Sequence, residues 1–333
     1  MSGARGRRAV AEALALLGLG LVVALGGHFF LSNYWLTVGV VIAMYSLPSL
    51  ALLLLLGYAG RPSFGHAAFF AVGAYASAVT TTRLGWDPVA GALAGIVVAG
   101  AVAYVIGFPL LRLSGHYLAI ATLAFAIIVR VVLENATPLT GGLNGIVGIP
   151  SLGTPRTAFV LVVMLVTIIY AAAVFIDHSR IGRILRALGD DERAMASCGI
   201  NPQSIRTAVF VASAVLTSIA GSVYAHFLTY ISPEPFNVDM SVLFVTMMLV
   251  GGTGSVWGAL IGACIVGAIP AVLSTYAAYS ALLYGIAIVA VLLLAPYGVL
   301  GLPTQLRIAR ARLRRIVASG SKPAQAGEVA NVD

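Results

Sequence analysis

Long apolar runs recur along this 333-residue chain, and most of them approach the length that a helix needs to cross a bilayer. The hydrocarbon core is about 30 Å thick, so a spanning helix takes about 20 apolar residues. Inside that core each backbone amide must be bonded within the protein, which favours helices. Only 9% of the residues are charged, against about 25% in soluble domains. The sequence therefore predicts an all-α polytopic membrane protein.

About ten segments meet this length criterion. The last two before the final segment lie close together and the first of them is short, so eight or nine spans result if that pair is re-entrant. We place the basic N-terminus at 1–10, the transmembrane domain at 11–302, and a basic, then disordered, tail at 303–333. The predicted spans lie near 11–31, 34–56, 64–82, 88–111, 117–134, 157–176, 205–228, 238–252, 256–275 and 280–298.

Clusters of arginine precede the first predicted span and follow the sixth and the last, and single arginines, Arg61 and Arg112, follow the second and the fourth. With ten spans all of these segments lie on one side of the membrane, and the positive-inside rule makes that side cytoplasmic. Arg83 and Arg156 are exceptions on the other side. We therefore expect both termini to be cytoplasmic, the chain to be embedded in membrane lipid, and the net charge of +8 to reflect topology rather than nucleic-acid binding.

The stretch 177–203 interrupts the apolar pattern, and we expect a short helix in the loop 178–203. Asp190 is the predicted N-cap, and Asp191 and Glu192 add acidic charge to the first turn. Gly199 predicts a left-handed stop, after which Asn201-Pro202 opens the next helix. So short a helix is not stable alone in water. It therefore docks either on a partner or, as an ordinary loop helix, on its own chain.

Glycine and proline interrupt the chain between the second and third predicted spans, where Ser63, Gly65 and His66 supply polar groups or close turns. Broken backbone at membrane depth is tolerated where protein or a water-filled cavity satisfies it. We therefore take these residues, with Tyr117 and Thr122 at the start of the fifth span, as candidates for a translocation path. The alternative is a plain cytoplasmic turn with Ser63 as a helix cap.

Two further glycine clusters have different interpretations. Gly141, Gly142, Asn144 and Gly145 lie in an outer loop, where tight turns with exposed amides suit a gate or a partner's docking site. An ordinary external loop is the alternative. The second cluster has four-residue steps, which favours close helix packing on one face; it consists of Gly254, Gly258 and Gly262.

The sequence argues against an enzyme. Lys322 is the only lysine, and no Gly-x-x-x-x-Gly-Lys-Ser/Thr loop is present, so this chain cannot bind ATP in that way. Neither metal-ligand spacing nor a nucleophile elbow occurs. We expect no catalytic residue, metal or cofactor in this chain.

The combined order of these stretches resembles the permease subunits of bacterial ATP-binding-cassette importers for branched-chain amino acids, from about Tyr34 to Leu302. The family's coupling motif, Glu-x-Ala-x-x-x-x-Gly, is matched by Glu192, Ala194 and Gly199. The resemblance implies an inner-membrane complex with a second permease subunit, two cytoplasmic subunits that bind ATP and Mg²⁺, and an extracytoplasmic substrate-binding protein.

The chain departs from the family pattern at two places near the predicted path. Arg61-Pro62 stands where relatives usually have Gln and an aliphatic residue, and Ile127 stands where they often carry Glu. A permease for urea or short amides is therefore an alternative. An ion-coupled secondary transporter is a further alternative, although mid-membrane carboxylates are scarce. A purely structural membrane scaffold would leave the broken helices unexplained.

Overall fold

The computed structural model describes residues 2–273, 285–286, 289 and 298–301. Helices dominate this part of the chain, and a two-stranded sheet is the other regular element. The principal helices are α1 (Ser2–Phe30), α2 (Asn33–Leu52), the π-helical turn η1 (Leu53–Tyr58), α3 (His66–Arg83), α4 (Pro88–Leu110), α5 (His116–Asn135), α7 (Pro155–His178), α8 (Arg180–Asp190), α9 (Glu192–Ser197), α10 (Pro202–Leu228), α11 (Val238–Gly251) and α12 (Val256–Leu273).

Six described helices are long and apolar enough to cross a membrane, or up to seven if the bent pair α11 and α12 forms one span. Helix α3 is not among them, because His66, Arg83 and three threonines lower its mean hydropathy. The predicted polytopic all-α class is confirmed, but the count of about ten is not. The last predicted span, near 280–298, lies mostly outside the described residues.

Helices α11 and α12 bend back on each other by 119° at a four-residue break. A Cβ atom on Gly262 would lie 1.8 Å from the Met247 carbonyl oxygen, and one on Gly251 would lie 1.7 Å from that of Gly258. These contacts leave no room for side chains at the crossing. Gly254, however, lies in the turn before α12 and has no neighbour within 4 Å. The predicted three-glycine face is therefore wrong at Gly254, because the helix begins only at Val256.

Helix α3 is central and packs against α4 and α10 through small residues. A Cβ on Gly221 of α10 would lie 1.9 Å from the Phe70 carbonyl oxygen, and one on Gly73 would lie 2.3 Å from that of Ser218. Without a hydrophobic driving force inside lipid, such close backbone approach is a main source of helix association. Helices α3 and α10 therefore pack backbone to backbone at these glycines.

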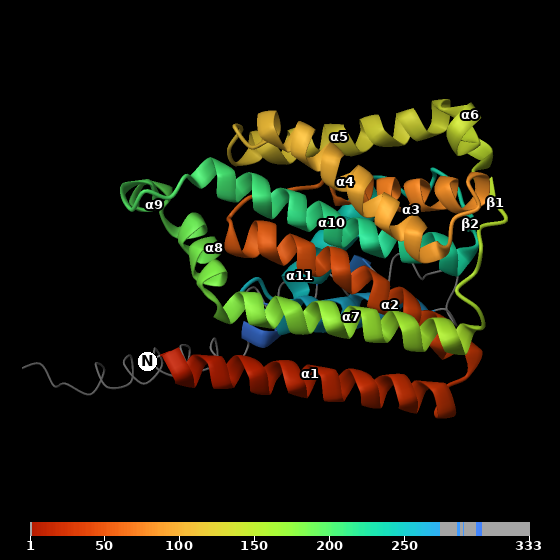
Figure 1. Cartoon of the computed structure of the whole chain (residues 1–333), viewed down its shortest axis with the longest axis horizontal. Coiled ribbons are helices and arrows are strands. Elements are labelled where there is room, and N and C mark those ends of the chain that lie inside the picture. The colour runs from red at the N-terminus through yellow and green to blue at the C-terminus, as the bar shows by residue number, and fades with distance from the viewer. Residues whose placement is uncertain (1, 274–284, 287–288, 290–297, 302–333) are drawn as a thin grey trace, which may run out of the picture.

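The two ends of the bundle differ (Figure 1). Helices α8 and α9 project from the ends of α7 and α10 at one end of the bundle. At the other end lie the short helix α6 (Thr137–Thr140) and the antiparallel strands β1 (Ile146–Val147) and β2 (Tyr230–Ile231), with Ile146 opposite Ile231.

Candidate coupling site and broken span

Helix α8 starts immediately after the end of α7 and turns sharply away from it. Ser179 caps it, because its hydroxyl accepts from the amides of Ile181 at 3.0 Å and Gly182 at 3.5 Å. A Cβ on Gly182 would lie 2.2 Å from the Asp177 carbonyl oxygen. The glycine therefore permits this close turn between a spanning helix and the projecting pair.

The cap of α9 is Asp191, not the predicted Asp190. The Asp191 carboxylate accepts from the amides of Arg193 at 2.8 Å and Ala194 at 3.1 Å. Asp190 is instead the last residue of α8 and is exposed. The sequence did not reveal that α8 continues as a helix up to this point, and this moved the cap by one residue.

The end of α9 follows the predicted pattern. Gly199 has φ +78°, and the amide of Ile200 donates a hydrogen bond to the Met195 carbonyl oxygen at 3.2 Å. Asn201 then caps α10 by accepting from the amide of Gln203 at 3.0 Å, with Pro202 as the first helical residue. Ala194 and Gly199 are both exposed, so α9 offers a surface of small residues to the solvent.

Glu192 is held between two arginines of its own chain. One carboxylate oxygen pairs with Arg61, which lies between η1 and α3, and the other pairs with Arg206 in the second turn of α10. Arg206 Nε also donates to Glu192 Oε1 at 3.1 Å. The side chains of Arg61 and Arg206 are only 12% and 15% exposed. Burial lowers the pKa of Arg61, which reflects the cost of desolvating its charge. We call these three residues the Glu192 triad.

A second contact joins the projecting helices to the broken span. A Cβ on Gly189, near the end of α8, would lie 2.4 Å from the Tyr58 carbonyl oxygen and 3.6 Å from the Gly60 amide nitrogen. Tyr58 ends the π-helical turn, and Gly60 has φ +62°. The backbone of α8 at Gly189 therefore packs against the backbone at the end of η1, where the helical span Asn33–Tyr58 ends.

Three side-chain hydroxyls accept backbone amides in the link between η1 and α3 and in the first turn of α3. Phe64 donates its amide to Thr122 Oγ1 of α5 at 3.0 Å, and Ala67 donates to Ser241 Oγ of α11 at 3.1 Å. Gly65 donates to Ser63 Oγ at 3.3 Å. Hydroxyl groups thus supply acceptors for backbone amides that regular helix bonding does not satisfy.

Ser63, Gly65, His66 and Thr122 are brought together at this break, and all four are buried. Ser63 Oγ lies 3.4 Å from His66 Nδ1, while His66 Nε2 has no hydrogen-bond partner among the described residues. Tyr117 does not join them, since its side chain is 74% exposed at the start of α5. Four of the residues predicted to line the translocation path therefore form one buried cluster in this structure, and Tyr117 lies outside it.

The outer glycine loop lies at the opposite end of the bundle from α8 and α9 (Figure 1). Gly141, Gly142 and Gly145 all have positive φ, and a Cβ on Gly145 would lie 1.9 Å from the Ile231 carbonyl oxygen. The Asn144 carbonyl accepts from the Tyr230 hydroxyl at 3.3 Å. The loop is therefore fastened to the end of α10 through β1 and β2.

Sequence reasoning missed three polar residues that hold these elements. Arg206 and Ser241 were passed over as single polar residues in apolar runs, although Arg206 lies near a recognised helix start. The third is His226, whose Nδ1–H donates to the Pro150 carbonyl at 2.8 Å while Nε2 accepts from Ser77 at 2.9 Å. Among the described residues, no group of three His, Cys, Asp or Glu side chains is placed to hold a metal.

The described residues thus form the helical bundle of a polytopic membrane protein, with an irregular link between η1 and α3 and a projecting helix pair at one end. A profile for the family described as "Branched-chain amino acid transport system / permease component" matches residues 34–295. The chain belongs to this family.

Two named relatives come from Escherichia coli K12. The chain is 31% identical to the high-affinity branched-chain amino acid transport system permease protein LivM, over 87% of this chain and 75% of LivM. It is 29% identical to the high-affinity branched-chain amino acid transport system permease protein LivH, over 78% of this chain and 92% of LivH. A partial match to the ribose import permease protein RbsC has 31% identity over 44% of this chain and 50% of RbsC. No solved structure matches this chain.

Proposed function

We propose that this chain is one permease subunit of an ATP-binding-cassette importer that moves branched-chain amino acids across the bacterial inner membrane, with both termini cytoplasmic. The family and the names of the relatives support the substrate class. LivM and LivH are two different permeases named for the same transport in one organism, which supports a second, non-identical permease as the partner. Two cytoplasmic ATP-binding subunits and an extracytoplasmic substrate-binding protein complete the proposed complex.

The observation that carries the coupling role is the double contact between the projecting helices and the broken span. Gly189 packs on Tyr58 and Gly60, and Glu192 pairs with Arg61. A displacement of α8 and α9 is therefore transmitted to the segment that leads into Ser63 and His66. In this proposal the ATP-binding subunits cover the exposed small residues of α9, while Glu192 transmits the motion rather than touching the partner.

Vectorial uptake in proteoliposomes tests the proposal. The chain is purified with the proteins encoded beside it, reconstituted, and supplied with ATP inside, with labelled leucine and the binding protein outside. We expect leucine uptake that requires ATP and survives an uncoupler. Uptake without ATP that collapses with the uncoupler would establish the ion-coupled alternative, and ATP-dependent uptake of urea or short amides but not leucine would correct the substrate.

Two substitutions distinguish binding of the ATP-binding subunits to α9 from transmission of its motion to the rest of the chain. Ala194→Trp places a large side chain on the exposed face of α9 and is expected to abolish co-purification with the ATP-binding subunits. Arg61→Gln removes one contact inside the chain and is expected to preserve co-purification but to lower the leucine transported per ATP hydrolysed. If Ala194→Trp leaves assembly and uptake unchanged, α9 is not the docking surface.

The path assignment has its own test. Ser63 and Thr122 are buried, whereas the native Cys198 and Cys264 are exposed. Ser63→Cys and Thr122→Cys are therefore made with both native cysteines replaced by Ser, and a membrane-permeant thiol reagent should label them slowly at rest. Turnover should accelerate labelling and leucine should protect against it. Uniform inertness during turnover would remove Ser63 and Thr122 from the path.

A further inference from the structure

Helix α3 begins inside the bundle rather than at its end. The Phe64 amide, two residues before the first residue of α3, donates to Thr122 Oγ1 at 3.0 Å. Thr122 lies six positions after His116, the first residue of the candidate span His116–Asn135, which is roughly 9 Å along the helix axis at about 1.5 Å per residue. The positive end of the α3 dipole therefore lies within the length of a neighbouring span, where an anion is otherwise poorly accommodated.

The amides around the start of α3 are bonded to hydroxyl groups. Gly65 donates to Ser63 Oγ at 3.3 Å, and Ala67 donates to Ser241 Oγ of α11 at 3.1 Å. Gly65 occupies the N-cap position and has no side chain that could cap the helix. These acceptors are neutral, although the N-terminus of a helix favours a negative charge. A carboxylate would therefore bind these amides more strongly than the hydroxyls do.

His66, the first residue of α3, supplies a polar atom that the protein leaves unpaired. Its side chain is fully buried, and Nε2 has no hydrogen-bond partner among the described residues. Ser63 Oγ lies 3.4 Å from Nδ1 and already accepts from the Gly65 amide, so its own hydrogen is free for Nδ1. This network assigns the proton of the neutral ring to Nε2. The start of α3 therefore has a buried N–H donor, which is unfavourable unless it meets an acceptor.

An apolar wall adjoins this donor. The ring of Phe69, one turn along α3, packs edge-on against the His66 ring with centroids 6.4 Å apart. Phe69 also contacts Phe125 of α5 and Phe210 of α10, at centroid distances of 5.3 and 5.4 Å, and all three phenylalanines are buried. An element that favours an anion thus lies beside an aromatic surface that suits a branched aliphatic side chain.

We propose that the start of α3 binds the α-carboxylate of the transported amino acid, with His66 Nε2–H and the first-turn amides as donors and the Phe69 ring beside the side chain. This inference rests on the proposed function, which supplies a substrate with a carboxylate and an apolar side chain. The hydroxyls of Ser63 and Ser241 accept from the amides in this structure, and the carboxylate would take their place. Access requires movement of the link before α3, which Arg61 ties to α9.

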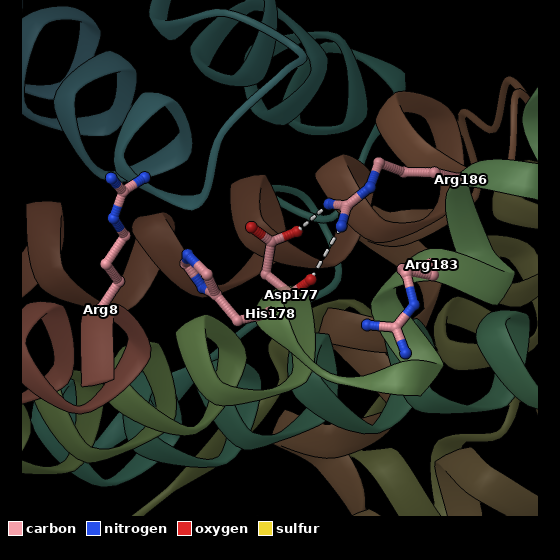
Figure 2. A pocket seen from close by; sticks show the side chains of 5 residues that line it. All are labelled: Arg8, Asp177, His178, Arg183 and Arg186. Atoms are coloured by element: carbon pink, nitrogen blue, oxygen red, sulfur yellow. Dashed lines mark hydrogen bonds and ion pairs between the residues drawn. The ribbon is translucent and has the colours of Figure 1, made fainter. Parts of the chain in front are cut away.

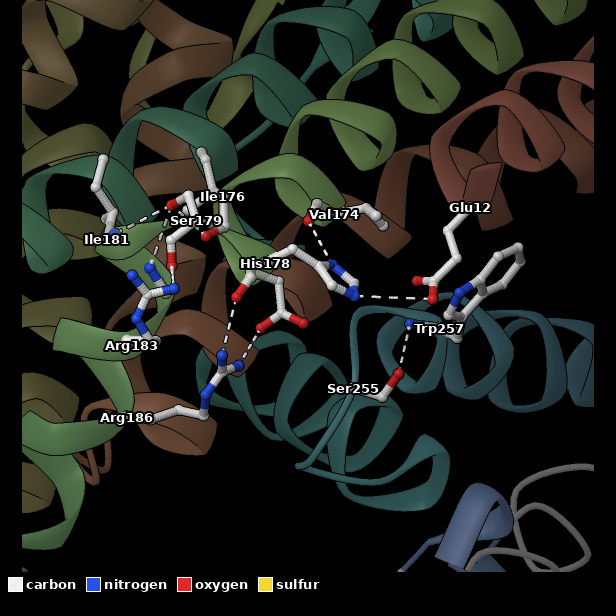
Figure 3. Close-up of polar contacts among 12 residues, drawn as sticks. Glu12, Val174, Ile176, His178, Ser179, Ile181, Arg183, Arg186, Ser255 and Trp257 are labelled. Atoms are coloured by element: carbon white, nitrogen blue, oxygen red, sulfur yellow. Dashed lines mark hydrogen bonds and ion pairs between the residues drawn. The ribbon is translucent and has the colours of Figure 1, made fainter. Parts of the chain in front are cut away.

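A polar pocket of about 420 Å³ at the junction of α1, α7 and α8 is the internal comparison (Figure 2). Its Arg186 pairs with the Asp177 carboxylate. His178 Nε2 faces Glu12 Oε1 at 3.7 Å (Figure 3). Arg183 also lines this pocket, but no aliphatic residue or phenylalanine does. The pocket would therefore hold an anion by charge alone, and removal of Arg183 tests for such binding.

Protection of a reporter cysteine tests this proposal. Ala126→Cys is introduced with both native cysteines replaced by Ser; Ala126 is buried and lies one turn beyond Thr122 on α5. The purified complex with its ATP-binding subunits hydrolyses ATP in detergent without the binding protein, so selection rests on the membrane subunits. A membrane-permeant thiol reagent is added with leucine, with isocaproate, which keeps the carboxylate but lacks the amine, or with isoamylamine, which keeps the amine but lacks the carboxylate.

We expect leucine and isocaproate to slow labelling at similar concentrations. His66→Phe keeps a buried ring but removes the donor, so it should raise the protecting concentrations of both about tenfold and leave that of isoamylamine unchanged. In the chain with His66 intact, isoamylamine should need about tenfold more than leucine for the same reason. His28→Phe, which also removes a buried unpaired ring nitrogen, and Arg183→Gln are the matched controls and should change nothing.

Equal protection by isoamylamine, unchanged leucine protection in His66→Phe, or an equal loss in either control would overturn the proposal. Displacement of leucine by chloride at the same concentrations would also overturn it, since the site would then accept any small anion. So would a failure of Ala126→Cys to be labelled during turnover, because the cluster would then stay closed throughout the cycle. If His66→Phe does not fold, the comparison of isocaproate with isoamylamine in the chain with His66 intact still decides.

The proposed function is judged separately, by uptake in proteoliposomes. Leucine uptake that persists alongside any of the overturning results leaves the proposed function standing and removes only the carboxylate site. Protection by isocaproate without leucine uptake supports the carboxylate site and corrects the substrate instead.

Discussion

Replacing Glu192 by Gln is the sharpest test of how α9 is held. The substitution preserves the size of the side chain but leaves Arg61 and Arg206 facing each other without a counter-charge. Removing one partner of a fully buried ion pair costs about 3–5 kcal/mol, while exposed pairs contribute about 0.2–1 kcal/mol. The arginines are 12% and 15% exposed and Glu192 is 32% exposed, so we expect a local cost of about 2–3 kcal/mol.

Hydrogen exchange of the amides in α9 measures this cost, because local opening governs their exchange. A loss of 2–3 kcal/mol corresponds to roughly 30- to 150-fold faster exchange, at about 1.4 kcal/mol for each factor of ten. Asp190→Asn is the matched control, since it makes the same charge change two residues away at an exposed position. An acceleration below about fivefold, or one equal to that of the control, would show that the triad behaves as a surface ion pair and would refute the reasoning.

Three further predictions follow from individual contacts. Asp191→Ala removes the N-cap of α9 and should cost about 1 kcal/mol, measured as about fivefold faster exchange of the Ala194 amide, whereas Asp190→Ala should not change it. Thr122→Val leaves the partly buried Phe64 amide without its acceptor and should cost about 1 kcal/mol, seen as a lower thermal midpoint in detergent, while Thr122→Ser should restore the midpoint. Gly262→Ala forces a Cβ into the Met247 backbone and should lower the yield of folded protein, whereas Gly254→Ala should be tolerated because nothing lies within 4 Å.

The sequence was sufficient for the class of fold because the spans are encoded by length and composition alone. It also located α9, since the stop at Gly199 and the start at Asn201-Pro202 depend on local backbone chemistry. The predicted N-cap of α9 is one residue too early, because α8 continues to Asp190. Helix α8 forms where the chain turns closely at Gly182 and packs on the bundle, and this packing cannot be deduced from local sequence. The count of about ten spans is not confirmed. Helix α3 is less apolar than the candidate spans because its small and polar residues serve helix packing, and the last predicted span lies mostly outside the described residues.

The pairing in the Glu192 triad could not be deduced from the chain alone, because its members are separated by 131 and 14 residues and meet only after α10 packs on α3. Arg61 had been noted as a departure from the resembled family, which usually carries Gln at that position. The structure gives the departure a physical consequence: a neutral amide would leave α9 attached to α10 through Arg206 but would remove its charged link to the broken span.

The two links between α8–α9 and the break differ in kind, and this has consequences for motion. The contact of Gly189 with Tyr58 is backbone against backbone and is set by shape, so it resists approach but does not oppose separation. The Arg61–Glu192 pair is attractive and directional, so it opposes separation. Together they make the junction rigid in both directions. A push and a pull on α9 would therefore both reach the segment before α3, which is what the proposed coupling role requires.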